Sequence, residues 1–384
     1  MLYKKMLKLS VIAGAVMALN ACSDKSGNIS ILSDSDTFYQ SSSVNNKIDI
    51  MWMVDTSASM QPYQTNLANN FNAFITDFVT KGYDYNMAVG GTDAWHRERT
   101  NYNGNSTHYY GGSITCATES EITAFRDGDI YGNLSVCGNQ SGNYLITSAM
   151  DPTTIINTFA TNIKVGIYSD GDERGFQSIR GVLRRNEDGS KGYGTETHTA
   201  LNSFRRDNAF LAVIIVADEE DGSRKKNGNN YSSMTDYRNS FISFLDGYTN
   251  SSAGNRKYNV SSIVMVDKAN CSNAHVGASN GYRYMDIADS TDGIIGDICD
   301  TNFSDNLKDI SGRIAELSTR FQLSRAPVPS SITVSVNDVS IPQNASNGWI
   351  YVSDQGFHFV EFRGNAVPQQ GAAIRIDFDP VSLE

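Results

Sequence analysis

Residues 47–59 read Lys47-Ile-Asp-Ile-Met-Trp-Met-Val-Asp-Thr-Ser-Ala-Ser59, an apolar run that changes abruptly to acidic and hydroxyl side chains at Asp55. An apolar run of this length indicates a buried strand, and the loop after it leads into a helix with Pro62 in its first turn. Gly82 is expected to end that helix. Its large apolar side chains recur at intervals of four, three and four residues, which marks one helix face: Leu67, Phe71, Phe74 and Phe78.

The same alternation of strand and helix continues along the chain. The run at 211–216 (Leu-Ala-Val-Ile-Ile-Val) is apolar on both faces, as in a parallel strand covered by helices on both sides. Further strands are expected at 85–90 and 260–266, and helices at 175–184, 234–245 and 307–321. This alternation predicts an α/β domain over residues 47–324, doubly wound, with a mostly parallel central sheet flanked by helices.

Two segments depart from this pattern. Residues 95–150, rich in Gly, Asn, Ser and Tyr, show no sustained period and are predicted to be a long surface insertion. After residue 324, apolar residues alternate with polar ones and no helical pattern remains, so residues 325–384 are expected to form a small all-β module. A module of this size is expected to depend on docking against its neighbour.

The first residues have the pattern of an export signal. Lys4, Lys5 and Lys8 precede an apolar run at 9–19 that is too short to span a bilayer. Residues 1–21 are therefore predicted to be a signal peptide that is removed from the mature protein.

The signal ends in Leu19-Asn-Ala-Cys22, which resembles the bacterial lipobox. The resemblance implies cleavage just before Cys22 and acylation of that residue, and two acyl chains anchor a protein firmly to a membrane. The alternative is an ordinary signal peptide with a chance cysteine. Ser23 stands where an Asp resembles an inner-membrane retention signal, so it points to the outer membrane of a Gram-negative cell. Residues 22–46, rich in Ser, Asn and Asp, are expected to be a flexible tether.

The four remaining cysteines agree with export, because an even number in an exported chain indicates disulfides. Three pairings are possible, and the two local pairs, Cys116–Cys137 and Cys271–Cys299, are favoured. The alternative is a four-cysteine zinc site, which the lack of any Cys-x-x-Cys spacing disfavours.

Acidic residues follow two of the predicted strands at their carboxyl ends, where ligands of open α/β sheets bind. Asp55, Ser57 and Ser59 occupy alternate positions of one loop, so their oxygens can point at one place. Asp218 begins an acidic cluster after the apolar run at 211–216 and can add a carboxylate directly or through water. Oxygen ligands in this arrangement suit a hard divalent cation such as Mg²⁺, with Ca²⁺ and Mn²⁺ as alternatives.

The Asp-x-Ser-x-Ser motif, set between an apolar strand and a helix and accompanied by a later strand that ends in Asp, resembles the metal-ion-dependent adhesion site of von Willebrand factor A and integrin I domains. The resemblance covers residues 47–324. It implies a cation at Asp55, Ser57, Ser59 and Asp218 that captures a carboxylate of a protein ligand. A non-enzymatic adhesion or protein-binding role is expected on that basis.

One position departs from the pattern of this family, which usually supplies a Thr from a third loop just before a helix. Here residues 170–175 read Asp-Gly-Asp-Glu-Arg-Gly, and Glu173 occupies the Thr-like place. A carboxylate there could ligate the metal, but its negative charge would weaken or replace the acid of the ligand. Alternatively, Glu173 is a residue at the helix N-terminus favoured by the helix dipole.

Charge and motif content narrow the classes of function. The net charge of −11 repels nucleic acid phosphates, so no nucleic acid partner is expected. The segment 277–281 matches a hydrolase nucleophile pattern by letter but follows no apolar strand, and no nucleophile–base set of an enzyme emerges. The sequence therefore predicts a lipid-anchored cell-envelope protein that binds a protein partner through a metal. The alternative is a structural or assembly factor of the envelope in which the metal mainly stabilises the fold.

Overall fold

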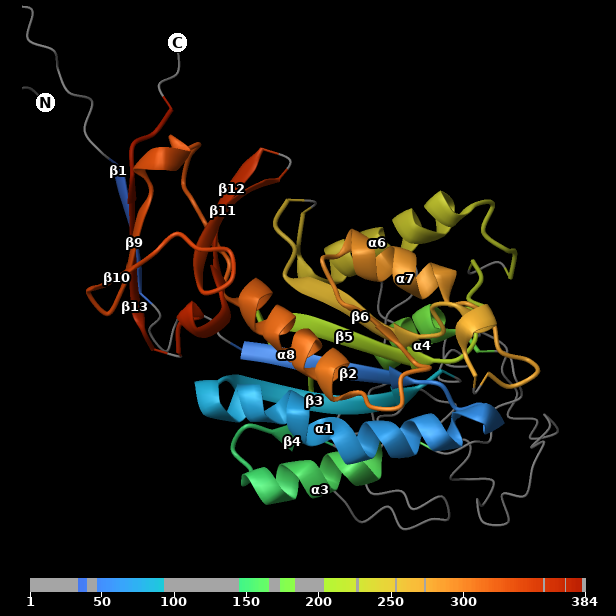
Figure 1. Cartoon of the computed structure of the whole chain (residues 1–384). Coiled ribbons are helices and arrows are strands. Elements are labelled where there is room, and N and C mark those ends of the chain that lie inside the picture. The colour runs from blue at the N-terminus through green and yellow to red at the C-terminus, as the bar shows by residue number, and fades with distance from the viewer. Residues whose placement is uncertain are drawn as a thin grey trace, which may run out of the picture.

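The structure, a computed structural model, describes residues 34–39, 47–92, 145–165, 173–183, 204–225 and 228–381, the last range without 253, 273, 355 and 370. These residues form an α/β layer with a β-rich module at one end of it (Figure 1). The predicted signal peptide, Cys22, the Cys116–Cys137 pair and most of the insertion expected at 95–150 lie outside the described residues.

The centre of the α/β layer is a six-stranded sheet in the order β4-β3-β2-β5-β6-β7. Its strands are β2 (Lys47–Val54), β3 (Asp84–Gly91), β4 (Ile146–Thr147), β5 (Phe210–Ala217), β6 (Tyr258–Val264) and β7 (Ile295–Asp297). Every neighbouring pair is parallel except β3 with β4. The mostly parallel sheet that the sequence predicts is therefore present, and the carboxyl ends of its parallel strands share one edge.

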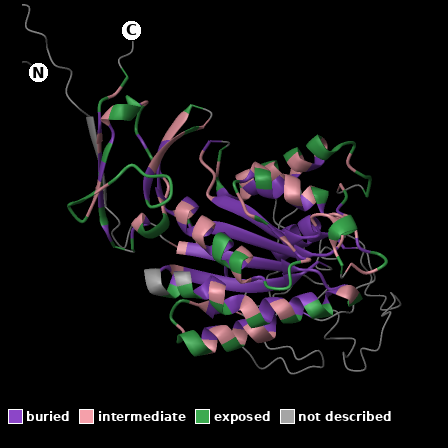
Figure 2. Ribbon diagram, in the orientation of Figure 1, coloured by how far each residue is buried: buried purple, intermediate pink, exposed green. Residues whose placement is uncertain are grey.

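Helices cover both faces of this sheet (Figure 1). One face carries α1 (Gln61–Lys81), α3 (Pro152–Asn162) and α8 (Ser304–Ser318), and the other carries α4 (Gly175–Val182), α6 (Met234–Thr249) and α7 (Tyr282–Ser290). Successive side chains of a strand point to opposite faces, so β2 contributes to both cores. Trp52 packs in the first core, and Met51 and Met53 pack in the second. Figure 2 shows the sheet buried between the helices.

Local signals set several helix ends. Gly82 takes a left-handed conformation (φ 65°) after α1, and its N–H donates to the last carbonyls of that helix, as expected of a terminating glycine. The Asp151 side chain accepts from Thr154 N at 3.0 Å at the start of α3, and Ser233 accepts from Asp236 N at 3.1 Å at the start of α6. Short 3₁₀ turns lie in the loops: η1 (Ala58–Met60), η3 (Lys268–Asn270), η4 (Pro329–Ser331) and η5 (Gly364–Ala366).

The β-rich module contains two antiparallel sheets. The four-stranded sheet has the order β1-β13-β9-β10, built from β1 (Asp34–Tyr39), β13 (Ala373–Phe378), β9 (Thr333–Val336) and β10 (Val339–Ile341). The three-stranded sheet has the order β11-β12-β8, built from β11 (Gly348–Asp354), β12 (Phe357–Arg363) and β8 (Phe321–Gln322).

Two boundaries differ from the sequence prediction. Residues 34–39, assigned to a flexible tether, pair with β13 from Asp34↔Phe378 to Tyr39↔Ala373, so the chain passes through the β-rich module before it enters the α/β layer. Phe321, assigned to the last helix, instead begins β8 and pairs with Val360. In both cases the pairing partner is distant in sequence, so no local pattern predicts the strand.

A buried carboxylate joins the β-rich module to α8. Glu361 of β12 is fully buried, and its oxygens lie 2.9 Å from Arg313 Nη1, 2.6 Å from Arg320 Nη2 and 2.5 Å from Arg363 Nη2. Arg313 belongs to α8 and Arg320 follows that helix, so the cluster spans both parts of the molecule. Because a buried charge is strongly destabilising without its partners, this cluster fixes the module on the α/β layer.

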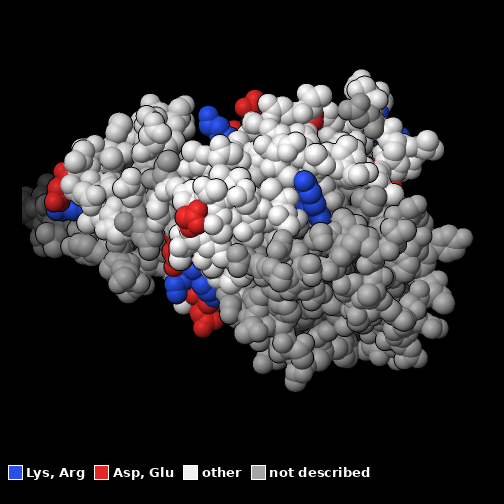
Figure 3. Space-filling model, turned by 90° about the horizontal axis from the view of Figure 1, so that it is seen from below, with Lys and Arg blue, Asp and Glu red and all other residues white. Residues whose placement is uncertain are grey.

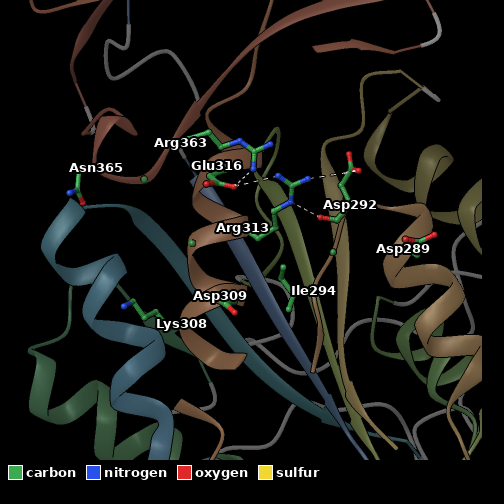
Figure 4. Close-up of a pocket in the computed structure, with 12 residues that line it drawn as sticks. Asp289, Asp292, Ile294, Lys308, Asp309, Arg313, Glu316, Arg363 and Asn365 are labelled. Carbon is green, nitrogen blue, oxygen red and sulfur yellow. Dashed lines mark hydrogen bonds and ion pairs between the residues drawn. The ribbon is translucent and has the colours of Figure 1, made fainter. Parts of the chain in front are cut away.

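An open groove of about 670 Å³ lies at the same junction (Figure 4). Acidic and basic side chains on its walls pair with one another, with Arg363 Nη1 2.7 Å from Glu316 Oε2 and Arg313 Nη2 3.8 Å from Asp292 Oδ1. The residues before β7 line it, so it lies at the amino end of the sheet. Charges of both signs in mutual contact favour no single class of charged ligand.

Three further observations bear on the sequence predictions. Cys271 and Cys299 form the predicted disulfide. Among the described helices, none is long and apolar enough to cross a membrane. On the face seen in Figure 3, the charged side chains among the described atoms are scattered and form no broad patch of one sign.

Candidate metal centre

The carboxyl ends of β2 and β5 bring two acidic residues to neighbouring positions. The two strands pair in parallel from Ile48↔Phe210 to Val54↔Val216. The N–H of Asp55 extends this ladder by donating to the Val216 carbonyl at 2.9 Å. Asp218 leaves β5 just beyond that carbonyl. The strand pairing therefore places both acids at the edge of the sheet where α/β proteins bind ligands.

The loop after β2 is closed by hydrogen bonds that reach across to β5. Asp55 Oδ1 accepts from Ser57 N at 2.7 Å, which turns the chain sharply. The hydroxyls of Ser57 and Ser59 are 3.0 Å apart, and Ser59 Oγ donates to Asp218 Oδ1 at 3.2 Å. The structure thus brings together four of the five residues predicted from the sequence to bind metal.

Neighbouring elements hold this loop from two sides. Gln64, in the first turns of α1, donates from Nε2 to the Asp55 carbonyl at 3.1 Å. Thr92, directly after β3, accepts the Thr56 N–H on its Oγ1 at 3.3 Å, and its own N–H donates to the Val54 carbonyl at 3.0 Å. The loop is therefore fixed by α1 and β3 as well as by its own turn.

The two carboxyl groups of the pair are fully buried, and among the described residues the Oδ2 atoms of both lack a hydrogen-bond partner. Burial and, next, the charge of Asp218 raise the pKa of Asp55 to about 8. Burial also raises the pKa of Asp218. Two carboxylates that share a site repel each other when both are ionised, so the pair favours either a bound proton or a nearby positive ion.

Glu173 lies on the next loop of the same edge. Its side chain is buried, its carbonyl accepts from Gly222 N at 2.8 Å, and Arg174 N donates to the Thr92 carbonyl at 3.3 Å. Within the described part of the chain, no three His, Cys, Asp or Glu side chains form a group that could hold a metal ion. The oxygens that lie together at this edge are those of the Asp55 and Asp218 carboxyl groups and the Ser57 and Ser59 hydroxyls, and the Glu173 loop contacts this edge through Thr92.

Asp221, the last residue of the acidic cluster that begins at Asp218, is buried away from the Asp55–Asp218 pair. Asp221 accepts from the Ser223 hydroxyl at 2.9 Å, from the Tyr284 hydroxyl at 3.3 Å, and from the Tyr237 hydroxyl. Burial raises the pKa of Asp221, and the hydrogen bonds from Tyr237 and Ser223 oppose the rise. The hydroxyl contacts satisfy Asp221 within the packing of α6 and α7, so it is separate from the Asp55–Asp218 pair.

Sequence reasoning missed three residues of the site. Thr92 could have been found as a polar residue directly after a strand, whereas Gln64 looked like an ordinary helix residue. His275 belongs to no recognisable motif in the sequence, yet its Nε2 lies 3.3 Å from Asp218 Oδ2. It reaches the site from an irregular loop after β6, where no periodic pattern marks its position.

No protein-family model matches the chain, and no curated protein matches it. Similar solved structures include the pilus adhesin SpaC from Lactobacillus rhamnosus GG, with TM-score 0.37 and 11% identity over 86% of this chain and 38% of that one. The human COPII-coat protein Sec24c gives TM-score 0.35 and 7% identity over 86% and 43% of the two chains. The pilus adhesin RrgA from Streptococcus pneumoniae gives 0.29 and 8% over 90% and 57%. This chain thus covers less than two thirds of each structure, and at these TM-scores the likeness carries no argument for its function.

Proposed function

We propose that the α/β layer is a von Willebrand factor A-type domain that binds one divalent cation at Asp55, Ser57, Ser59 and Asp218. The observation that carries the proposal is the pair of fully buried carboxyl groups, linked through Ser57 and Ser59, with Asp55 Oδ2 left without a hydrogen-bond partner among the described residues. Oxygen donors of this kind suit Mg²⁺, Mn²⁺ or Ca²⁺. Burial and, next, the charge of Asp218 raise the pKa of Asp55, and a cation of charge two would offset both.

A cation at this edge would supply a positive centre for an acidic group from outside. Asp55 and Asp218 would hold it from below, and the half-buried Ser59 lies toward the surface beside the exposed Ala58. We therefore propose that the partner is a protein that offers a carboxylate to the metal, and that the role is non-enzymatic binding or adhesion. Glu173 stays a candidate ligand whose charge would compete with that carboxylate.

The position of the site suits a protein anchored at its amino terminus. The β-rich module, which holds β1, lies at the end of the α/β layer opposite the carboxyl edge of the sheet (Figure 1). We propose that lipidated Cys22 precedes this module in an envelope lipoprotein, at the outer membrane of a Gram-negative cell. The metal edge would then face away from the membrane.

The second candidate is a structural or assembly role in which the metal mainly stabilises the fold. The complete burial of Asp55 and Asp218 favours it, because a cation held that deeply stabilises the native state in which its ligands converge. The two candidates differ in what the loss of metal does: the first loses the partner, and the second loses stability.

A pull-down from envelope extract in Mg²⁺ or in chelator separates the candidates. The binding role predicts a protein retained by the wild type in Mg²⁺ and lost both in chelator and in Asp55→Ala, although the protein stays folded at the assay temperature in both cases. His358→Ala, on β12 in the β-rich module, serves as the control and should retain the partner. The stabilising role predicts a melting temperature that falls in chelator, with any partner still bound to the folded fraction.

A further inference from the structure

His275 contacts the acidic pair from outside the sheet. Its Nε2 atom lies 3.3 Å from Asp218 Oδ2 and 3.4 Å from Glu219 Oε1, and its side chain is 33% exposed. The imidazole is thus the positively polarised group that faces the Asp218 oxygen not used by Ser59. Nε2 has no hydrogen-bond partner among the described residues, so both contacts are electrostatic.

The loop that carries His275 is tied to the acidic segment at several points. The Cys271–Cys299 disulfide closes it on one side. On the other side, Ser279 N donates to the Asp218 carbonyl at 3.2 Å, and Ser279 Oγ accepts from Glu220 N at 2.8 Å. The ring is therefore held over Asp218 by covalent and main-chain contacts, and its position does not depend on the two carboxylates alone.

The local hydrogen bond of the ring decides which nitrogen carries the proton. Gly277 N donates to His275 Nδ1 at 2.9 Å, so Nδ1 must offer its lone pair. In a neutral imidazole one nitrogen accepts and the other carries the hydrogen, which places the hydrogen on Nε2. An Nε2 atom that carries a proton has no lone pair for a metal, so His275 faces Asp218 as an N–H group.

Building on the proposed metal site, we propose that His275 is a positioning residue: its Nε2–H attracts the carboxylates of Asp218 and Glu219 electrostatically and so keeps the other oxygen of Asp218 directed toward Ser59 and the cation. Outer partners of this kind orient a ligand without binding the metal. An imidazole ligand would instead favour zinc, nickel or copper over Mg²⁺ and Mn²⁺. The site therefore keeps its preference for hard cations although a histidine touches it.

Calorimetric titration of the purified, disulfide-bonded protein with Mn²⁺ tests this role through two substitutions. His275→Ala removes the N–H and is expected to weaken Mn²⁺ binding by about 10- to 100-fold, as loss of an outer partner does. His275→Gln keeps an N–H donor and is expected to restore most of the affinity. His358→Ala, far from the site, should bind as the wild type does. Equal affinity in His275→Ala and wild type would overturn the proposal, and so would a His275→Gln variant as weak as His275→Ala.

Two further readouts separate this inference from the proposed function. If wild-type protein binds no Mn²⁺, the proposed function fails and the positioning role fails with it. Nitrogen NMR of metal-free protein in alkaline buffer, where imidazole rings are neutral, should show the proton of His275 on Nε2. A proton on Nδ1, or a His275→Ala variant that loses Zn²⁺ binding while Mn²⁺ binding is unchanged, would make His275 a ligand and contradict the proposal, with the metal site itself intact.

Discussion

Buried carboxylates at the two ends of the central sheet differ in whether they have positively charged partners. At the amino end, Asp49 is fully buried and its oxygens lie 2.7 Å from Arg205 Nη1 and 2.8 Å from Arg206 Nε. Glu361, where the β-rich module docks, has three arginine partners. At the carboxyl end, Asp55 and Asp218 are equally buried, yet among the described residues no lysine or arginine pairs with either of them.

This difference separates ion pairs that hold the fold from carboxylates that lack a counter-ion. An ionised carboxylate moved out of water costs several kcal/mol unless a partner compensates it. The amino end supplies that partner from the chain itself. The carboxyl end supplies hydroxyls and one histidine, so the remaining negative charge must be neutralised by a proton or by a bound cation.

The largest loss of stability is expected from substitution of Glu361, whose charge is fully paired. Glu361→Ala leaves three arginines around an empty space, and it should lower the free energy of unfolding by about 3–5 kcal/mol, as loss of one partner of a buried pair does. Denaturant unfolding monitored by circular dichroism measures this. Asp292→Asn, which removes the charge of a half-exposed partner of Arg313 and Arg320 and suits the positive φ of that position, is the matched control and should cost at most about 1 kcal/mol. A Glu361→Ala protein as stable as its control would contradict the assignment.

Loss of the Cys271–Cys299 disulfide, in the loop that carries His275, is expected to have the next largest effect on stability. Replacement of Cys271 and Cys299 together by Ala opens a 28-residue loop, which in the chain-entropy model should cost about 3 kcal/mol of stability. Because the same loop positions His275, Mn²⁺ affinity should fall as well. A variant that loses stability and keeps full Mn²⁺ affinity would show that the disulfide supports the fold without supporting the site.

The pH dependence of stability tests the role of Asp55 on its own. The pKa of Asp55 is raised to about 8 in the folded protein, against an ordinary value near 4 when unfolded, so between these values the native state holds the extra proton. Stability of metal-free protein should therefore fall as pH rises from about 4 to 8, because the slope follows the difference in bound protons between the two states.

Melting temperatures measured in chelator across this pH range test the sign. Asp55→Asn should flatten the dependence, and at pH 7 the metal-free variant should be more stable than the wild type, because only the unfolded wild type gains free energy from ionisation of this side chain. Saturating Mg²⁺ should also remove the fall, since the cation takes the place of the proton. A metal-free wild type that becomes more stable between pH 5 and 8 would contradict the role given to Asp55.

Much of the α/β layer could be predicted because its signals are local. The apolar runs of β2 and β5 and the repeat of Leu67, Phe71, Phe74 and Phe78 on α1 follow directly from burial on a strand or on one helix face. α3 had a signal that was overlooked, with Asp151 as the cap and Ile155 and Phe159 on one face. β1 and β8 had none, because each is formed only when a distant strand pairs with it.

The residues of the candidate site also fall into those that local signals predict and those that they do not. Asp55, Ser57, Ser59 and Asp218 could be placed together because the ends of neighbouring parallel strands must meet. His275 and Gln64 reach the site only because a loop and a helix pack over that edge of the sheet. No local sequence pattern marks either residue. The loop of Glu173 contacts Thr92 at the same edge, and the role of Glu173 as a ligand stays a prediction.

The measurement that tests the central claim most directly is calorimetric titration of Mn²⁺ or Mg²⁺ into wild type and Asp55→Ala at neutral pH. A site at Asp55 and Asp218 predicts about one ion per chain, with proton release that makes the heat depend on the buffer. Asp55→Ala should lower the affinity by about 100-fold or more while its circular dichroism spectrum stays that of the wild type. A wild type that binds no divalent ion at millimolar concentration, or an Asp55→Ala protein that binds as tightly as the wild type, would contradict the account.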